Sequence, residues 1–527
     1  MSNSTGDHHH TPGQDNIRLL GFDVHNPVFI ISAVSIIAFV VITLLMPVQA
    51  ATFFNTMRKW LTSTFDWWFM IAGNFFVLFC LLLVLTPLGR IRLGGANAKP
   101  DFTYAGWFAM LFAAGMGIGL IFYGVLEPLN HFRSPPLGVD SGDTAAAMRA
   151  AMSGTIFHWG LHAWAIYACV ALSLAFFHFN RGMPLTLRSA FFPLLGNRVW
   201  GWPGHAIDIL AVFATLFGLA TSLGLGAGQA NAGLNYLFGI PVSDTSKVLL
   251  IIGISTLATI SVFAGLDAGI KRLSAVNMWL AFTLMLFVIV TGPTTLILAG
   301  FFKNAAGYAA DLPALSNWVN RPDTKFLHGW TTFYWAWWIS WSPFVGMFIA
   351  RISKGRTIRE FILYVLIVPT IITILWMSSF GGTAINQVVA YNYQGVVETI
   401  TTWRPELALF KMLEQLPLAS LSSAIGIVLV IVFFVTSSDS AALVIDTIAA
   451  GGKIDTPAAQ RVFWCSFQGI AAIVLLLGGG LGALQAMASA TGFPFSIVLV
   501  LMCLATLKGL VAESRMEAAK TKNAADP

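Results

Sequence analysis

Charged residues are scarce in this sequence. They make up 10% of it, whereas 57% of the residues are hydrophobic. Soluble proteins average about 25% charged residues, so this scarcity excludes a water-soluble globular protein. Cysteine is also rare, and no CxxC spacing occurs, which excludes a disulfide framework and a cysteine metal site and favours packed free thiols. The sequence also lacks any evident pairing of a nucleophile with a general base, so nothing indicates covalent catalysis.

Long apolar runs are abundant instead. A run of about 18 apolar residues or more can cross a bilayer as a helix. The chain therefore reads as an all-α integral membrane protein with twelve transmembrane helices. The predicted spans are residues 28–48, 68–88, 103–125, 152–178, 205–230, 247–265, 275–300, 328–350, 361–381, 420–450, 462–482 and 490–508.

The positive charges indicate an orientation. With the N-terminus in the cytoplasm, most of the 29 Lys and Arg residues fall in cytoplasmic loops and tails. We therefore expect both termini to be cytoplasmic, and this asymmetry accounts for the net charge of +6 without any nucleic-acid partner. The polar residues 1–25, which include His8, His9 and His10, are expected to form a disordered tail rather than a metal site.

One apolar stretch, residues 330–359, is unusually rich in tryptophan. At 100° per residue, Trp337, Trp338 and Trp341 fall within an arc of roughly 100° on a helix. Trp159, Trp164 and Tyr167 span about 140° on another predicted helix. Indole faces attract cations, and two facing walls of this kind would hold a quaternary ammonium group. Dense packing between helices explains the same pattern, and the sequence does not decide between the two.

His158 and His162 are four residues apart, a spacing that also suits a pair of metal ligands. No acid or third histidine is adjacent in sequence, so we expect hydrogen-bonded structural histidines. A membrane-embedded metalloenzyme that uses the two histidines is the alternative from another class of function.

Two further segments carry unusual chemistry for a membrane helix. Gly115, Gly117 and Gly119 alternate within the third span, where broken backbone can expose carbonyl and amide groups to a substrate or an ion. Close helix packing is the other explanation for these glycines. In the tenth span, residues 436–440 read Thr-Ser-Ser-Asp-Ser, hard oxygen ligands that suit a small cation or a hydrogen-bond network between helices.

Four motifs together resemble the betaine/choline/carnitine transporter (BCCT) family. They are GMGIGLIFYGVLEP at 115–128, HWGLHAWAIY at 158–167, WAWWISWSPFVGMFIARISKGRTIREF at 335–361 and FFVTSSDSA at 433–441. The resemblance implies a LeuT-like fold of 5+5 inverted repeats preceded by two extra helices, and a homotrimer. The implied parts are a cytoplasmic tail (1–27), two peripheral helices (28–100), the first repeat (101–300), a periplasmic loop with an amphipathic helix (301–327), the second repeat (328–508) and a short cytoplasmic tail (509–527).

The resemblance also implies functional residues. An aromatic box for a trimethylammonium head would comprise Trp159, Trp164, Tyr167, Trp337, Trp338 and Trp341, with backbone at Met116, Gly117 and Gly119 near the substrate carboxylate. One sodium site would use Ala113, Met116, Phe433, Thr436 and Ser437. A second would use Thr215 and Phe344, but Leu219 stands where the family's other threonine would be, which weakens that site.

The expected activity is secondary active import of a zwitterionic onium compound, because Gly119 stands where choline-carrying relatives tend to have Asp. Glycine betaine comes first, then dimethylsulfoniopropionate or carnitine, with Na⁺ symport by alternating access. Proton-driven choline transport is the alternative. We expect no cofactor, a bacterial inner-membrane location and the lipid bilayer as the surrounding partner.

Overall fold

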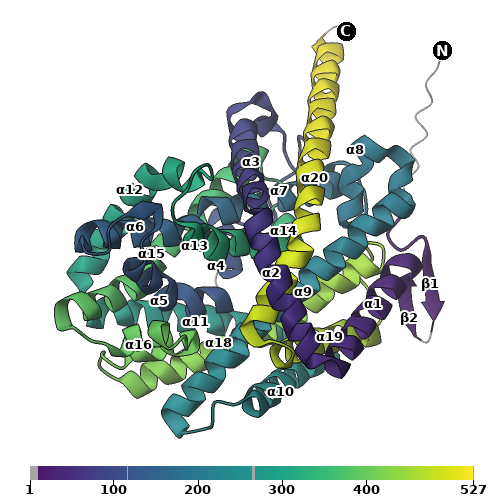
Figure 1. Ribbon diagram of the computed structural model, residues 1–527. Coiled ribbons are helices and arrows are strands. Elements are labelled where there is room, and N and C mark those ends of the chain that lie inside the picture. The colour runs from purple at the N-terminus through teal and green to yellow at the C-terminus, as the bar shows by residue number, and fades with distance from the viewer. Residues whose placement is uncertain (1–9, 20, 116, 264–266, 526–527) are drawn as a thin grey trace.

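The computed structural model describes residues 10–19, 21–115, 117–263 and 267–525, which are almost entirely helical (Figure 1). This confirms the all-α prediction. Twenty α-helices and one two-stranded hairpin follow one another along the described chain. They are β1 (Asn16–Leu19), β2 (Phe22–His25), α1 (Asn26–Leu45), α2 (Pro47–Thr64), α3 (Asp66–Leu85), α4 (Tyr104–Gly115), α5 (Ile118–Arg133), α6 (Thr144–Trp159), α7 (Leu161–Ala175), α8 (Phe192–Leu195), α9 (Trp202–Phe238), α10 (Asp244–Phe263), α11 (Asp267–Thr291), α12 (Thr294–Ser316), α13 (Thr324–Phe326), α14 (Thr332–Arg351), α15 (Ile358–Tyr391), α16 (Gly395–Thr401), α17 (Ala408–Leu413), α18 (Ala419–Ala449), α19 (Ala458–Leu477) and α20 (Gly480–Ala525).

Ten spans among the described residues are long and apolar enough to cross a membrane, and the bent pair α4–α5 makes an eleventh. The predicted fourth span corresponds to α6 and α7 together. The predicted eighth span is α14, which is not among the eleven, because its many Trp, Ser and Thr residues make it less apolar than the others. A count of twelve crossings therefore stays a prediction.

Several predicted boundaries are wrong. The seventh span was expected to end at 300, but α11 ends at Thr291 and α12 already begins at Thr294, because Pro293 cannot continue the ladder of α11. The eleventh was expected to end at 482, but α19 ends at Leu477. Gly479 and Gly480 then take positive φ angles of 152° and 62°, which lets α20 start at once. Residues 509–525 of the predicted C-terminal tail continue α20, which projects from the molecule in Figure 1.

The prediction of a disordered N-terminal tail is wrong for residues 16–19 and 22–25, which form the antiparallel strands β1 and β2. Asn16 Nδ2 donates to the carbonyl of Ala450 at 3.0 Å, and Lys453 Nζ donates to Asp23 Oδ2 at 2.5 Å. Burial opposes ionisation of Asp23, but hydrogen bonds from Lys453 and Asn16 outweigh it and lower the pKa of the Asp23 carboxyl. Asn16 and Asp23, two of the polar residues of this segment, thus bind the connection between α18 and α19.

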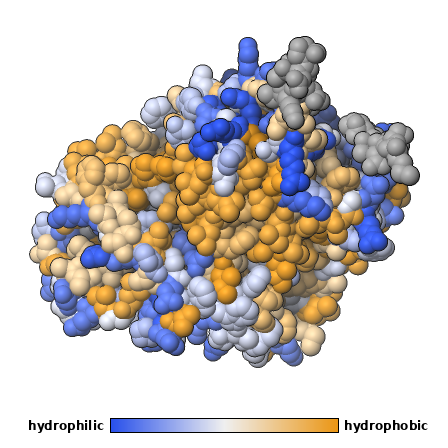
Figure 2. Space-filling view, turned by 90° about the horizontal axis from the view of Figure 1, so that it is seen from above, coloured by the Kyte–Doolittle hydropathy of each residue, from blue (hydrophilic) through white to orange (hydrophobic). Residues whose placement is uncertain are grey.

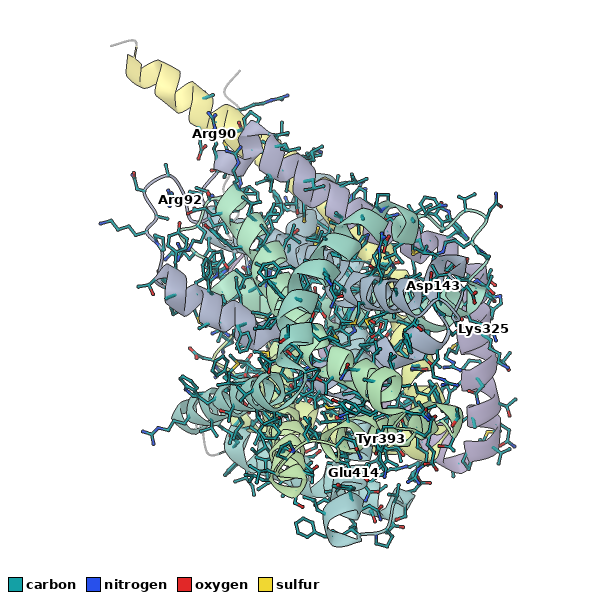
Figure 3. All side chains as sticks on the ribbon, turned by 90° about the vertical axis from the view of Figure 1, so that its left-hand side faces the viewer. Arg90, Arg92, Asp143, Lys325, Tyr393 and Glu414 are labelled. Atoms are coloured by element: carbon teal, nitrogen blue, oxygen red, sulfur yellow. The ribbon has the colours of Figure 1, made fainter. Side chains whose placement is uncertain are left out.

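The outer surface is largely hydrophobic. Leu45 on α1 is 76% exposed and Leu85 on α3 is 80% exposed. Figure 2 shows a broad hydrophobic surface with hydrophilic groups mostly towards its rim. Figure 3 shows Arg90 and Arg92 near the end of the molecule from which α20 extends, with Tyr393 and Glu414 at the opposite end. This distribution of apolar surface between polar ends is typical of a protein surrounded by lipid.

Candidate functional site

The third span is interrupted in the middle, as the alternating glycines predict. Its two helices, α4 and α5, meet at an angle of 67°. Gly117 has extended backbone with φ −161° and ψ 176°, and α5 begins at the next residue. Met116, which the sequence predicts to contribute to both the substrate site and the sodium site, lies outside the described residues.

Gly119 lies against the tips of two tryptophan rings. A Cβ atom at position 119 would lie 2.9 Å from Cη2 of Trp159 and 2.9 Å from Cη2 of Trp337. At Gly117, by contrast, a Cβ would meet no heavy atom within 4 Å. Glycine is therefore required at position 119 so that α5 can approach the tips of two indole rings.

The fourth span is also broken, at Gly160 between α6 and α7. Gly160 has φ −98° and ψ −131°, which leaves carbonyl groups of the preceding turn without helical partners. The indole Nε1 of Trp338 donates to the carbonyl of His158 at 2.8 Å, and Thr373 Oγ1 donates to that of Trp159 at 3.4 Å. Side chains from α14 and α15 thus satisfy the broken backbone of this span.

The two predicted aromatic walls face each other. The ring centroids of Trp159 and Trp338 are 4.9 Å apart at an interplanar angle of 70°, and those of Trp159 and Trp337 are 6.4 Å apart at 84°. Tyr167 lies 6.2 Å from Trp338 at 73°, and Trp164 lies 5.4 Å from Tyr167 at 77°. Near-perpendicular rings from α6, α7 and α14 therefore form one continuous aromatic cluster.

Trp341 lies on the side of α14 that faces α9. Its Nε1 donates to the carbonyl of Gly218 at 2.8 Å, and Nε1 of Trp337 donates to the same oxygen at 3.3 Å. Trp341 remains partly exposed and packs edge-on against Phe344, with ring centroids 5.3 Å apart. Its ring is thus the accessible member of the α14 wall.

Sequence reasoning missed two tyrosines of the cluster. Tyr334 lies 5.5 Å from Trp159 and 5.6 Å from Trp338, and Tyr123 on α5 lies 6.1 Å from Trp159. The signal for Tyr334 was present, because positions 334, 337, 338 and 341 share one face of a helix. Tyr123 is four residues after Gly119, so it lies on the same face of α5.

A buried carboxylate, Glu127, lies behind the cluster and was also missed. The predicted third span ends at residue 125, but α5 continues to Arg133 and carries Glu127 to a fully buried position. Its Oε1 accepts from His158 Nδ1 at 2.6 Å and from His131 Nε2 at 3.3 Å. Its Oε2 accepts from Trp159 Nε1 at 2.7 Å and from the Tyr334 hydroxyl at 2.5 Å.

The two histidines of the predicted metal pair have different partners. His162 Nε2 lies 3.0 Å from Oδ1 of Asn74, and its ring stacks on Trp335 at 5.3 Å. Both histidines are hydrogen-bonded, as the sequence predicts, whereas their purely structural role stays a prediction. The ligand atoms of Glu127, His131 and His158 lie within 4.8 Å of one another and are of types that bind metals, but both carboxylate oxygens already accept hydrogen bonds.

The predicted sodium ligands are distributed over several helices. Phe433, Thr436 and Ser437 lie on the unbroken helix α18, where Thr436 Oγ1 donates to the carbonyl of Val432 at 2.9 Å. Ala113 lies near the end of α4, next to the interruption.

The second predicted sodium site involves α9 and α14. Thr215 Oγ1 donates to the carbonyl of Ala211 at 2.8 Å. Leu219, one turn further along, is buried and offers no oxygen from its side chain, and Phe344 lies on α14. Both predicted sodium sites stay predictions.

The thiols agree with the expectation from their spacing. All four cysteines are free and buried, and the sulfur atoms of Cys80 and Cys169 are 3.8 Å apart, too far for a disulfide bond.

The chain is similar to known membrane transporters over most of its length. Residues 27–515 match the model of a family described as BCCT, betaine/carnitine/choline family transporter. The chain is 56% identical to the glycine betaine/proline/choline transporter of Vibrio parahaemolyticus, over 97% of this chain and 95% of that one. It is 51% identical to glycine betaine transporter 1 of the same organism, over 96% and 97% of the two chains. It is 46% identical to the glycine betaine transporter OpuD of Bacillus subtilis, over 87% and 89%.

Proposed function

The chain belongs to the betaine/carnitine/choline family of membrane transporters, and from this premise we propose that it imports glycine betaine by sodium-coupled symport. The family and its named members are transporters rather than enzymes, so the metalloenzyme alternative is set aside. The proposal concerns the substrate, the coupling ion and the residues that bind them.

The aromatic cluster at Gly119 carries the proposal. Trp159 and Trp338 lie nearly perpendicular to each other, which presents the face of one ring and the edge of the other around a common point. A quaternary ammonium group against a desolvated indole face gains about 2 kcal/mol per ring. Such a group carries its positive charge without any N–H donor, so it suits a site built of aromatic faces.

The charge of the substrate is argued from position 119. An aspartate there would place its Cβ 2.9 Å from two indole carbons, and its carboxylate would repel that of a zwitterion. Glycine leaves the substrate carboxylate free to approach backbone amides near Gly117, at the N-terminus of α5. Glycine betaine is also the compound common to the names of the three relatives above. Dimethylsulfoniopropionate and carnitine fit the same charge pattern.

Choline is the second candidate substrate. The relative that is 56% identical to this chain is named a glycine betaine/proline/choline transporter. Choline has no carboxylate, so it would use the aromatic cluster alone, with protons as the coupling ion.

Sodium is proposed to bind between the interruption of the third span and α18, with ligands at Ala113, Met116, Phe433, Thr436 and Ser437. The interruption supports this arrangement because backbone carbonyls without helical partners can coordinate a cation together with hydroxyls from a second helix. We further propose that the 5+5 inverted repeats, twelve crossings, a homotrimer, cytoplasmic termini and a bacterial inner-membrane location apply to this chain.

The test is uptake of radiolabelled glycine betaine into proteoliposomes under an imposed Na⁺ gradient or an imposed pH gradient. Trp341→Ala should abolish uptake, because it removes the partly exposed ring of the α14 wall. Trp279→Ala is the matched control, because Trp279 is 70% exposed on α11, away from the cluster.

Uptake that follows only the pH gradient would refute sodium coupling and leave the substrate intact. Stronger binding of choline than of glycine betaine in competition would refute the argument from Gly119. Wild-type uptake by the Trp341 variant would remove this ring from the proposed site.

A further inference from the structure

Glu127 is a charged group in the interior of a membrane protein, where a carboxylate is tolerated only if it is well compensated. Glu127 lies on α5 and its side chain is fully buried. Four side-chain groups donate hydrogen bonds to it, two at each oxygen. Only an ionised carboxylate accepts at both oxygens without presenting a donor of its own. Four donors fill the four lone-pair sites of the two carboxylate oxygens, so side chains of the protein alone compensate the charge, and each donor is held in place by it.

The two donors at Oε2 belong to the two aromatic walls. Trp159, which donates at 2.7 Å, comes from α6, and Tyr334, which donates at 2.5 Å, comes from α14. Both rings contact Trp338, at 4.9 Å and 5.6 Å between centroids. Oε2 therefore holds the N–H edge of the Trp159 indole and the hydroxyl of Tyr334 in fixed positions.

The other oxygen, Oε1, accepts hydrogen bonds from two imidazoles instead. Oε1 lies 2.6 Å from His158 Nδ1, and Nε2 of His158 lies 2.9 Å from Thr331 Oγ1, immediately before α14. His131, one turn along α5, lies 3.3 Å from the same oxygen. The imidazoles thus fix the plane of the carboxylate, and the carboxylate fixes the indole.

We propose that Glu127 is a positioning residue for onium binding: its carboxylate sets the orientation of the Trp159 ring through the indole N–H and does not itself touch the substrate. This inference rests on the proposed function, because it assigns the aromatic cluster to the substrate. An indole without a fixed hydrogen bond at Nε1 can rotate about its side-chain torsions, and cation–π attraction depends on presenting the ring face.

Glu127→Gln is the informative change because it keeps the size of the side chain. The amide supplies one acceptor oxygen and one NH₂ group, so either the Trp159–Tyr334 pair or the histidine pair then faces a donor. We expect binding of radiolabelled glycine betaine to purified protein to weaken at least tenfold, with choline as a parallel probe.

A double-mutant cycle with Trp159→Phe separates positioning from other roles. Phenylalanine has no N–H, so Glu127→Gln should weaken binding by a much smaller factor in the Trp159→Phe background than in the wild type, with the contact to Tyr334 accounting for what remains. The same fold-loss in both backgrounds would overturn the proposal, because Glu127 would then act independently of the indole. One equivalent of bound divalent metal, lost in Glu127→Gln, would also overturn it by making the cluster a metal site.

A pair of matched histidine variants keeps the test available if Glu127→Gln does not fold. His158→Gln loosens the carboxylate and should weaken binding about threefold or more, and this loss should again be smaller in the Trp159→Phe background. His162→Gln removes an imidazole four residues away that bonds to Asn74, and it should leave affinity unchanged. Equal losses from the two histidine changes would overturn the proposal.

Failure of the proposed function has its own signature. If Trp159→Phe alone binds both probes as tightly as the wild type, the aromatic cluster is not the substrate site, and both proposals fall. If Trp159→Phe weakens binding and Glu127→Gln adds its full effect to it, only the role of Glu127 falls.

Discussion

Replacement of Gly119 by alanine tests the aromatic cluster with a single methyl group. The new Cβ would lie 2.9 Å from Cη2 of both Trp159 and Trp337. Carbon atoms in contact are about 3.5–4.0 Å apart, so each ring tip must recede by about 0.6 Å or more. Neither ring is free to do so, because Nε1 of Trp159 donates to Glu127 and Nε1 of Trp337 donates to the carbonyl of Gly218.

The size of the effect follows from this overpacking. Forcing a methyl group into a filled core costs about 1–3 kcal/mol. If that cost falls on the ring positions that hold the onium head, the affinity for glycine betaine should drop about 5- to 150-fold. Equilibrium binding to purified protein measures the affinity, and the KM of uptake in proteoliposomes should rise in parallel while the protein remains folded.

Gly253→Ala is the matched control, because Gly253 lies within α10 and a Cβ there would meet no atom within 4 Å. It should bind and transport as the wild type does. Wild-type affinity of Gly119→Ala would refute the reasoning, because it would mean that the ring tips move freely or that the substrate binds elsewhere.

Three further predictions follow from other contacts. Trp338→Phe should weaken onium binding about 2- to 30-fold, because it shrinks a ring worth about 0.5–2 kcal/mol to a cation; equilibrium binding measures this, and unchanged affinity would contradict the box. Thr436→Ala should abolish the stimulation of uptake by Na⁺ without unfolding the protein; retained stimulation would remove Thr436 from the ion site. Burial opposes ionisation of Asp323, but hydrogen bonds from Arg321 and the amide of Leu137 outweigh it and lower the pKa of Asp323, so its stabilising effect should be present above about pH 4 and be lost as pH falls through the lowered pKa. Asp323→Asn should therefore cost about 1–3 kcal/mol at pH 7, and this cost should shrink in acid thermal-unfolding scans; an equal cost at all pH values would refute it.

The sequence was most informative about features that depend on the residues of one helix alone. The interruption at Gly117 was predictable because glycines disfavour helix locally, and the Trp337–Trp338–Trp341 wall was predictable from helical periodicity alone. Facing walls needed the structure, because the contact between Trp159 and Trp338 depends on how α6 and α14 pack.

Other features depended on contacts between distant segments. Glu127 was missed because an acid at the predicted end of a span looks like an interfacial residue, and its partners His158 and Tyr334 are distant in sequence. The pairing of β1 with β2 was not predicted for a similar reason, since Asp23 meets Lys453 only in the folded chain. Hydrogen bonds between residues that are so far apart in the sequence leave no periodic pattern in it.

The hydrogen bonds that hold the indole rings limit which substitutions this protein can accept during evolution. Trp159, Trp337, Trp338 and Trp341 each donate their ring N–H to a partner outside the cluster, and in the case of Trp338 that partner is backbone at the break of the fourth span. An exchange of one of these rings for Phe or Tyr would alter the cavity wall and also release a carbonyl or carboxylate that the fold needs to satisfy. A descendant lineage adapting to a new solute therefore has an easier route through positions without such a second duty. Gly119 does not qualify, since any side chain there would press on the tips of Trp159 and Trp337.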